Sequence, residues 1–331
     1  MQSSDLGWEG RRPLIPTARP WRALLESREF TIFAFLLALS VALSLRYPQF
    51  RTQPNLADVL LNVSQLAIVG IGMTMVILTA GIDVSVGSAL GVCAVVVGDL
   101  LIGTHAAVVA VVGGVMAGVV IGLTNGLLVA LGRVHSIIIT LAMLNILRLV
   151  GFALLHGNWL TGIPSDLSAL GNGTVLGVPI AWWLAMGLGG LATYFLRSRP
   201  SGRHLYAIGG DVEAARLAGV RVTRLTVFVY ALTGALAGLA AAVFVGQQGQ
   251  VQTNAGSGFE LQVIAAVVIG GTSILGGKGS VVGTVLGALL VGVIRNALVV
   301  AHVPALFEGL VLGALIIVAI GLDLLHRRRG H

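Results

Sequence analysis

Residues 63–102 read VSQLAIVGIGMTMVILTAGIDVSVGSALGVCAVVVGDLLI, and this stretch decides the fold. Two apolar runs, 63–80 and 85–102, are separated by a short segment that carries Asp83. A helix needs about 20 apolar residues to cross the hydrocarbon layer of a bilayer, and each run comes close to that length. The stretch therefore predicts two spanning helices joined by a polar break.

The composition of the rest of the chain agrees with a membrane protein. Hydrophobic residues make up 56% of the 331 residues and charged residues only 10%, whereas soluble domains carry about 25% charge. We expect an all-α integral membrane fold with about ten transmembrane helices. The predicted spans are 29–45, 63–80, 85–102, 106–131, 135–155, 178–196, 223–246, 259–275, 281–300 and 305–323.

The positions of Arg and Lys orient these spans, because short cytoplasmic loops are enriched in both. With the N-terminus inside, 16 of the 20 basic residues fall on the cytoplasmic side. They lie in the N-terminal tail, at Arg133, between Arg197 and Arg224, at Lys278 and at Arg327 to Arg329. This asymmetry predicts that both termini are cytoplasmic, and it accounts for the net charge of +7 without nucleic acid.

The domain organisation follows from this map. Residues 1–28 form a cytoplasmic tail with no apolar core before residue 30, which excludes an ordinary cleaved signal peptide. Residues 29–323 form the transmembrane domain, with a cytoplasmic loop at 197–224, and 324–331 form a basic cytoplasmic tail. The single cysteine, Cys93, is expected to be a buried packing residue.

Two connections are too long to be simple turns. The outer segment 156–178 is expected to be an ordered loop or a short interfacial helix. The cytoplasmic loop contains DVEAARLAG, in which Asp211 can cap a short helix and Gly219 can end it. We expect this helix to be exposed, with a small apolar face suited to a groove, made of Ala214, Ala215, Leu217 and Ala218.

Small residues recur at a spacing of four and predict close helix packing in lipid. The pairs and triplets are Gly87/Gly91, Gly118/Gly122/Gly126, Gly234/Gly238, Gly283/Gly287 and Gly309/Gly313.

Ionisable residues inside spans are functional candidates because their burial in lipid is costly. Arg148 and Arg295 both lie roughly 20 Å from the cytoplasmic face, in the outer half of the bilayer. Their guanidinium groups could bind a solute in the membrane path, or they could be structural and bonded to backbone carbonyls. No carboxylate partner for Arg148 is evident from the sequence. The candidate path residues are Arg148, Arg295, Asn145 and Asn296.

The polar break is a second candidate site, formed by Asp83, Ser85 and Gly87. The carboxylate of Asp83 can cap the start of the following helix, or it can take part in gating. Glu260, which follows a Gly-Ser-Gly turn, is expected to be a charge at a helix start. Four glutamines on the adjoining outer loop could face a solute, a docking protein or water: Gln247, Gln248, Gln250 and Gln252.

Signatures of enzymes are missing, so we predict no catalytic residues and no metal ligands. One segment, TSILGGKGS, superficially resembles a phosphate-binding loop. That loop needs Gly at position 272 and Ser or Thr at position 279, where this chain has Thr272 and Gly279. Lys278 is then a topology marker on a glycine-rich cytoplasmic turn, and any nucleotide must bind another polypeptide.

Four strings make the chain similar to a known family, the permeases of ribose-type ATP-binding-cassette importers. They are LTAGIDVSVGSALG near residue 78, IITLAMLNILR near 138, GRHLYAIGGDVEAARLAGVRV near 202 and GFELQVIAAVVIGGTSILGGKGSVVGTVLGALL near 258. The family also serves galactose, arabinose, xylose, rhamnose and autoinducer-2. The outward strings around WLTGIP and TNAGSGFE look closer to the autoinducer-2 and rhamnose branches than to ribose.

The resemblance implies a subunit of the bacterial inner membrane that imports a monosaccharide or sugar-like solute. Its partners would be a second permease copy, a cytoplasmic ATPase and a periplasmic binding protein. ATP would bind the ATPase, and the permease itself would hold no cofactor. The stretch that resembles the family's coupling helix comprises Gly210, Asp211, Glu213, Ala214, Ala215, Arg216 and Gly219.

Two departures from the family pattern flank the fifth span. The family often has Pro shortly before this span and Gly after its Arg, where this chain has Val134-His135-Ser136 and Leu149. Arg148 matches the family Arg, whereas Arg295 has no clear match.

Two other function classes compete with this interpretation. A secondary transporter that works alone would need acidic residues deep in its spans for ion coupling, and the predicted spans are nearly free of them. An intramembrane enzyme would need a catalytic cluster, which the sequence lacks.

Overall fold

The computed structural model describes residues 28–132 and 134–304, with scattered positions between 307 and 321. In this part of the chain, seven helices are long and apolar enough to cross a membrane. They are α2 (Arg28–Arg46), α3 (Gln53–Leu78), α4 (Val86–Thr104), α5 (Ala107–Gly132), α6 (Ser136–Leu154), α11 (Val222–Gln248) and α13 (Val281–Val300).

The remaining elements are shorter or lie in the connections. They are η1 (Pro48–Arg51), η2 (Ser165–Leu167), α7 (Ser168–Asn172), β1 (Thr174–Val175), β2 (Val178–Pro179), α8 (Ile180–Ser198), α9 (Pro200–Gly210), α10 (Val212–Leu217) and α12 (Phe259–Ile269). The two strands pair antiparallel, Thr174 with Pro179 and Val175 with Val178. The outer connection is thus ordered, as predicted, and includes a small hairpin as well as a short helix.

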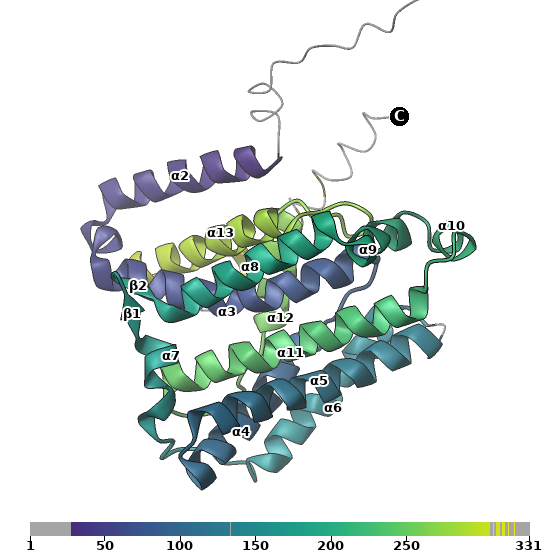
Figure 1. The fold of residues 1–331 in the computed structure, drawn as a ribbon. Coiled ribbons are helices and arrows are strands. Elements are labelled where there is room, and N and C mark those ends of the chain that lie inside the picture. The colour runs from purple at the N-terminus through teal and green to yellow at the C-terminus, as the bar shows by residue number, and fades with distance from the viewer. Residues whose placement is uncertain are drawn as a thin grey trace, which may run out of the picture.

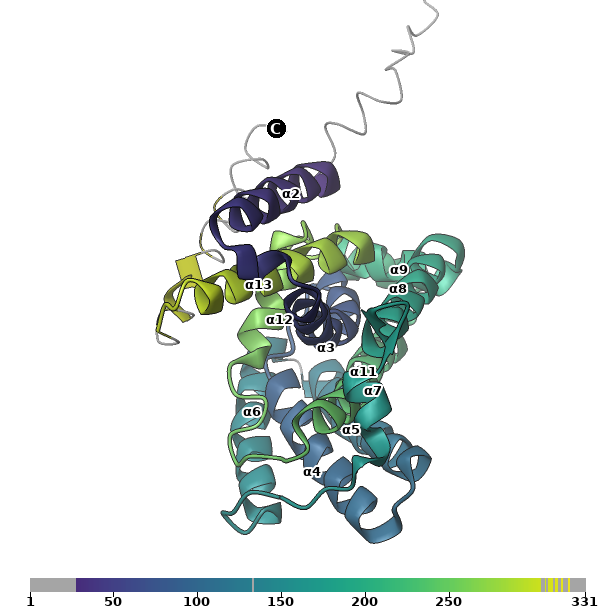
Figure 2. The same cartoon turned by 90° about the vertical axis from the view of Figure 1, so that its left-hand side faces the viewer.

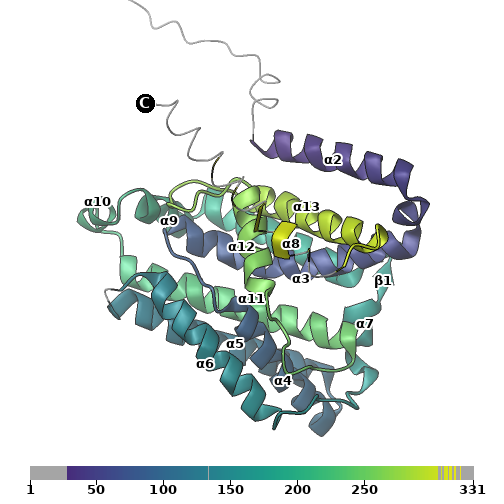
Figure 3. The same cartoon turned by 180° about the vertical axis from the view of Figure 1, so that it is seen from behind.

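The long helices run roughly side by side in a bundle around α3, whose residues are mostly buried (Figure 1). The α9–α10 arm lies at one end of the bundle, and α7 with the hairpin lies at the other (Figure 1). Seen along the bundle, α12 runs between α13 and the side of α4 and α6 (Figure 2). The view from behind shows α2 on the outside of the bundle, beside α13 (Figure 3). The two long connections therefore lie at opposite ends of the bundle.

The crossing of α5 and α11 is close and depends on glycine. A Cβ placed on Gly118 would overlap the carbonyl of Gly234, and one on Gly234 would overlap the carbonyl of Gly118. Direct backbone contact of this kind is how helices associate in lipid. The predicted packing role holds for Gly118, Gly122 and Gly126 against α11, whereas Gly309 and Gly313 meet no neighbour within 4 Å among the described residues.

The observed elements refine the span map. α8 has 19 residues but is not among the seven candidate spans, and α12 has only 11 residues, too few to cross. The last predicted span, 305–323, lies for the most part outside the described residues, as do Arg133, the tail 1–27 and the tail 324–331. Cys93 is buried in α4, as expected for a packing residue.

Candidate solute path and coupling arm

The polar break between α3 and α4 is held by hydroxyl groups of α6. Ser136 Oγ accepts a hydrogen bond from Ile82 N at 3.0 Å, and Thr140 Oγ1 accepts one from Val84 N at 3.2 Å. Thr140 Oγ1 also donates a hydrogen bond of 3.1 Å to the carbonyl oxygen of Ile82. Buried non-helical backbone needs such partners because it makes neither helical hydrogen bonds nor bonds to water. The break is therefore a built feature rather than a simple turn.

A buried polar cluster lies beside this segment. Asp83 Oδ1 accepts from Ser85 N at 2.9 Å and from Ser85 Oγ at 2.6 Å. From α5, Asn125 Nδ2 donates to Ser85 Oγ at 2.7 Å and lies 3.4 Å from Asp83 Oδ2. Ser85, and not Asp83, is the residue at the N-cap of α4. Ser85 makes no side-chain cap bond of its own, and the carboxylate of Asp83 holds the turn just ahead of the helix by accepting from the N–H of Ser85. A part of Asp83 in gating stays a prediction.

A cavity of about 480 Å³ lies beside this cluster, lined from Ser88 onward along α4. We call it the outer cavity, because the predicted topology places this end of α4 outside. It is formed by α4, α6 and the loop ahead of α12. Such a volume lies within the range of small-molecule sites. Its polar lining residues are Ser88, Arg148, Gln252, Thr253, Asn254 and Ser257. The apolar part of the wall includes Val92, Val95, Leu147 and Phe152.

Arg148 enters this cavity from α6 and has a carboxylate partner that sequence reasoning missed. Its Nη2 lies 3.5 Å from Oε1 of Glu260, at the start of α12. The Glu260 side chain is buried, whereas that of Arg148 is 48% exposed. Glu260 does lie in the first turn of its helix, as expected, but it also pairs with an arginine 112 residues away. Only the tertiary fold could reveal this pair.

The other predicted path residues lie elsewhere, and none of them lines this cavity. Asn145 is exposed on α6, and its amide donates to the carbonyl of Leu141 in the same helix at 2.9 Å. Asn296 exchanges hydrogen bonds with Asn55 of 2.8 and 3.1 Å, which join α13 to α3. Arg295 is exposed on α13. Of the four, the structure brings only Arg148 to the cavity.

A second cavity, of about 380 Å³, lies toward the α10 end of the bundle. Its wall includes Gly81, Ser136, Arg216, Thr226 and Tyr230. It shares no lining residue with the outer cavity, and residues 82–87 belong to neither. In the sequence, the segment 82–87 thus connects Gly81, in the wall of the second cavity, to Ser88, in the wall of the outer cavity. We call the second cavity the inner cavity.

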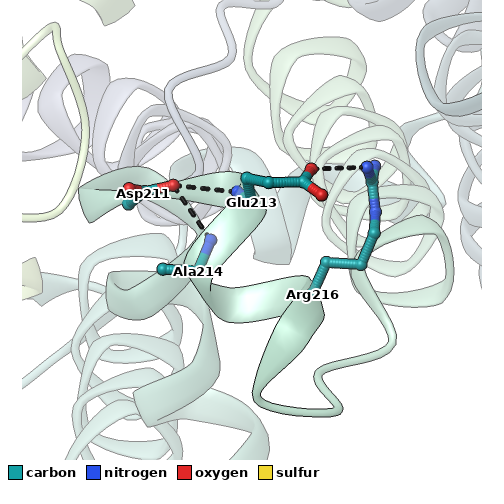
Figure 4. A network of polar contacts seen from close by, with 4 residues as sticks. All are labelled: Asp211, Glu213, Ala214 and Arg216. Carbon is teal, nitrogen blue, oxygen red and sulfur yellow. Dashed lines mark hydrogen bonds and ion pairs between the residues drawn. The ribbon is translucent and has the colours of Figure 1, made fainter.

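The helix predicted within the loop 197–224 is present as α10, and its ends form as expected. Figure 4 shows the end that Asp211 caps. Asp211 Oδ1 accepts from Glu213 N at 2.9 Å and from Ala214 N at 3.0 Å. At the other end, Gly219 adopts φ +82°, a left-handed conformation that glycine adopts without strain. Glu213 Oε2 pairs with Arg216 Nη1 at 2.8 Å on the surface. The sequence therefore encodes both boundaries of this helix locally.

The apolar face of α10 differs from the prediction. Ala215 is buried against Ile208 and Val220, because α9 forms an additional helix on which α10 packs. The most exposed large apolar residue of α10 is Leu217, which is 83% accessible; Val212, at the start of the helix, is 45% accessible. The surface that α10 offers to a partner is therefore made by Leu217, Ala214 and Ala218, and not by Ala215.

The α9–α10 arm is fixed to the glycine-rich turn ahead of α13. Tyr206 Oη donates to the carbonyl of Gly279 at 3.2 Å, and Gly277 N donates to the carbonyl of Leu78 at 3.0 Å. Burial raises the pKa of the Tyr206 phenol above its ordinary value, although the charge of Arg197 opposes this, so Tyr206 remains a protonated donor. The arm, the end of α3 and this turn thus form one contact region.

A family model described as "Branched-chain amino acid transport system / permease component" matches residues 55–320. This match covers most of the chain and includes the polar break, the outer cavity and the α9–α10 arm. The fold and the match define the chain as a permease subunit.

Individual relatives show to which branch of this family the chain is similar. The ribose import permease protein of Escherichia coli (strain K12) is 39% identical over 305 residues, which is 91% of this chain and 94% of the relative. That of Haemophilus influenzae is 35% identical over 306 residues, again 91% and 94%. The autoinducer 2 import system permease protein of Salmonella typhi is 35% identical over 292 residues, 88% of this chain and 84% of the relative. No solved structure matches the chain.

The chain therefore belongs to the permeases of the ribose-type ATP-binding-cassette importers, multi-pass proteins of the bacterial inner membrane. The E. coli ribose permease has a higher identity to this chain than the autoinducer 2 permease has. The Haemophilus influenzae ribose permease and the autoinducer 2 permease are equally similar, at 35%, so the resemblance of the outward strings to the autoinducer-2 and rhamnose branches stays a prediction.

Proposed function

We propose that this permease imports a monosaccharide or sugar-like solute of the ribose, rhamnose or autoinducer-2 class into the cytoplasm. The observation that carries the proposal is the 39% identity to a ribose import permease along 305 residues. The cavity beside Arg148 agrees with it, because a chamber of about 480 Å³ with hydroxyl, amide and guanidinium groups suits a polyhydroxylated solute.

The importer would contain two permease copies, two ATPase domains and a periplasmic binding protein. Ten spans with both termini in the cytoplasm would place the α9–α10 arm on the ATPase side. There, Leu217 and the small residues beside it would sit in a groove of the ATPase. ATP would bind only the ATPase, and the permease would perform no bond chemistry.

The solute path would pass from the outer cavity toward the inner one. In this mechanism the Asp83 cluster is the barrier between them, and motion of the α9–α10 arm is transmitted through the contact of Tyr206 with Gly279 and of Gly277 with Leu78. Alternating access then requires the segment 82–87 to move relative to α6. The hydroxyls of Ser136 and Thr140 hold that segment in the present arrangement.

Uptake by proteoliposomes tests this function. Vesicles that contain the permease with its ATPase facing inward, and the binding protein outside, should accumulate D-ribose only when ATP is enclosed inside the vesicle. Omission of the ATPase should abolish accumulation. A stand-alone secondary transporter would instead accumulate the sugar without the ATPase when a proton or sodium gradient is imposed.

A further inference from the structure

Two buried oxygen atoms near the outer cavity have no hydrogen-bond partner among the described residues. They are Ser88 Oγ and Glu260 Oε2, and both are inaccessible. An unsatisfied buried polar atom is unfavourable unless a water or ligand supplies a partner. Ser88 lines the cavity directly. Ser88 therefore places an unpartnered hydroxyl in the cavity wall, whereas Glu260 is not a lining residue and acts on the cavity through its ion pair with Arg148.

The charges at this site cancel. Arg148 contributes one positive charge to the cavity wall, and Glu260, 3.5 Å away, contributes one negative charge. Gly87 permits the carboxylate to approach, because a Cβ at residue 87 would overlap Glu260 Oε2 and the carbonyl of Gly256. An arginine alone would attract anions, whereas this pair presents strong hydrogen-bonding groups without a net charge.

The rim of the cavity is also uncharged. A smaller chamber of about 260 Å³ adjoins it and is lined by the amides of Gln248, Gln250, Gln252 and Asn254. The two chambers share Gln252, Asn254, Ala255 and Ser257. Gln247 does not take part, because its side chain accepts from Gln65 Nε2 at 2.6 Å and is fixed to α3. The route into the cavity thus continues the neutral, polar lining.

We propose that Glu260 is a specificity-determining residue that balances the charge of Arg148, so that the outer cavity accepts neutral polyols and discriminates against anionic sugars. The unpartnered hydroxyl of Ser88 lies in the wall of the same site. This inference rests on the proposed function, since it assigns residues to the path of the imported sugar. It adds that loss of the Glu260 charge makes the cavity favour anionic solutes over neutral ones.

The test measures the charge preference of the cavity without knowledge of the solute. Ser257, exposed and shared by both chambers, is replaced by Cys in a Cys93→Ser background, and the full chain is assembled with its ATPase in lipid nanodiscs. The reaction rates of the introduced thiol with an anionic and a cationic methanethiosulfonate reagent of similar size are then compared. Glu260→Gln should raise the anionic-to-cationic rate ratio about tenfold, and Arg148→Gln should lower it about tenfold.

The double variant Arg148→Gln/Glu260→Gln provides the matched control, because it removes both charges and should return the ratio to that of the unmodified pair. Co-purification of the ATPase with both single variants and with the double variant shows that the fold is retained. A changed rate ratio then reports a change in charge. An unchanged ratio in Glu260→Gln, with the expected fall in Arg148→Gln, would overturn the proposal by showing that Glu260 does not contribute to the field in the cavity.

Protection by sugars links this result to solute choice. Millimolar D-ribose should slow modification at residue 257 in the parent, and its anionic relative D-ribonate should not; in Glu260→Gln, D-ribonate should become the better protector. Protection by D-ribonate in Glu260→Gln, but not in the parent, supports the charge inference. Failure of D-ribose to protect any variant would count against the sugar proposal and would leave that result unaffected. Equal protection by D-ribonate in the parent and in Glu260→Gln contradicts the charge inference.

Discussion

Asn125 on α5 donates a 2.7 Å hydrogen bond to Ser85, the N-cap residue of α4, and so joins two helices through the polar break. Replacement of Asn125 by Leu removes this bond and the contact with Asp83. A buried acceptor that loses its donor costs about 1–3 kcal/mol. We expect a lower thermal unfolding midpoint of the purified permease, measured by intrinsic fluorescence. Asn145→Leu is the matched control, because that amide is exposed and bonds only within α6; equal midpoints for the two variants would contradict the role given to Asn125.

The membrane topology is open to a direct labelling test. Ser165 and Ser201 are exposed in connections at opposite ends of the bundle. In a Cys93→Ser background, a Cys introduced at residue 165 should react with an impermeant thiol reagent outside intact spheroplasts. A Cys at residue 201 should react only after the membrane is opened. Labelling of both positions from outside would refute the ten-span orientation.

The coupling role of α10 predicts a specific effect at its exposed tip. Leu217→Glu places a charge on the surface that would meet the ATPase, but it disturbs little within the permease because Leu217 is 83% accessible. We expect at least roughly tenfold weaker co-purification with the ATPase, or hydrolysis that no longer responds to the solute-loaded binding protein. Leu176→Glu is the matched control, since Leu176 is 92% accessible in the turn between β1 and β2, at the other end of the bundle. An equal loss in both variants would mean that the effect does not belong to α10.

Ala215→Asp should act differently from Leu217→Glu. Its carboxylate would be buried among Ile208 and Val220, and an unpaired buried charge is costly. This variant should therefore loosen the α9–α10 arm itself, which limited proteolysis of the membrane-embedded protein would detect. Normal proteolytic resistance of Ala215→Asp would show that Ala215 faces solvent after all.

The crossing of α5 and α11 predicts a large loss of stability from a single glycine. Gly118→Leu would drive a side chain into the backbone of Gly234, and overpacking of this kind typically costs about 1–3 kcal/mol or more. We expect lower yield and a lower unfolding midpoint. Gly187→Leu on α8 is the control, because no described atom lies within 4 Å of a Cβ there; a similar loss in both variants would point to glycine flexibility instead of helix contact.

Local sequence signals predicted much of the fold. Apolar runs located the long helices within a few residues, since a spanning helix satisfies its own backbone and needs little tertiary information. The caps of α10 were predictable for the same reason, because Asp211 and Gly219 act within one turn of the chain. By contrast, α3 begins at Gln53, well before the apolar run at 63–80 that predicted it.

The site was less predictable, because its geometry depends on contacts distant in sequence. The pairing of Arg148 with Glu260 and of Asn296 with Asn55 joins residues 112 and 241 positions apart, and no periodicity marks either pair. The sequence did single out Arg148, since a charge within an apolar span is rare. The family resemblance set Arg148 apart from Arg295, but the residues alone could not show which side chain reaches the cavity or that Ala215 would be covered by α9, because helix rotation and packing decide both.

The shortness of α12 bears on how this protein is made. At 1.5 Å per residue its 11 residues extend about 16 Å, roughly half the hydrocarbon thickness. The translocon partitions segments into lipid by their length and hydrophobicity, and a segment this short is a poor substrate for independent release. During synthesis, α12 would therefore enter together with α13, against α3 and α4, which it contacts. The loop that completes the outer cavity ends at Ser257, directly ahead of α12, so the short helix that anchors this loop is among the last parts of the chain to be placed.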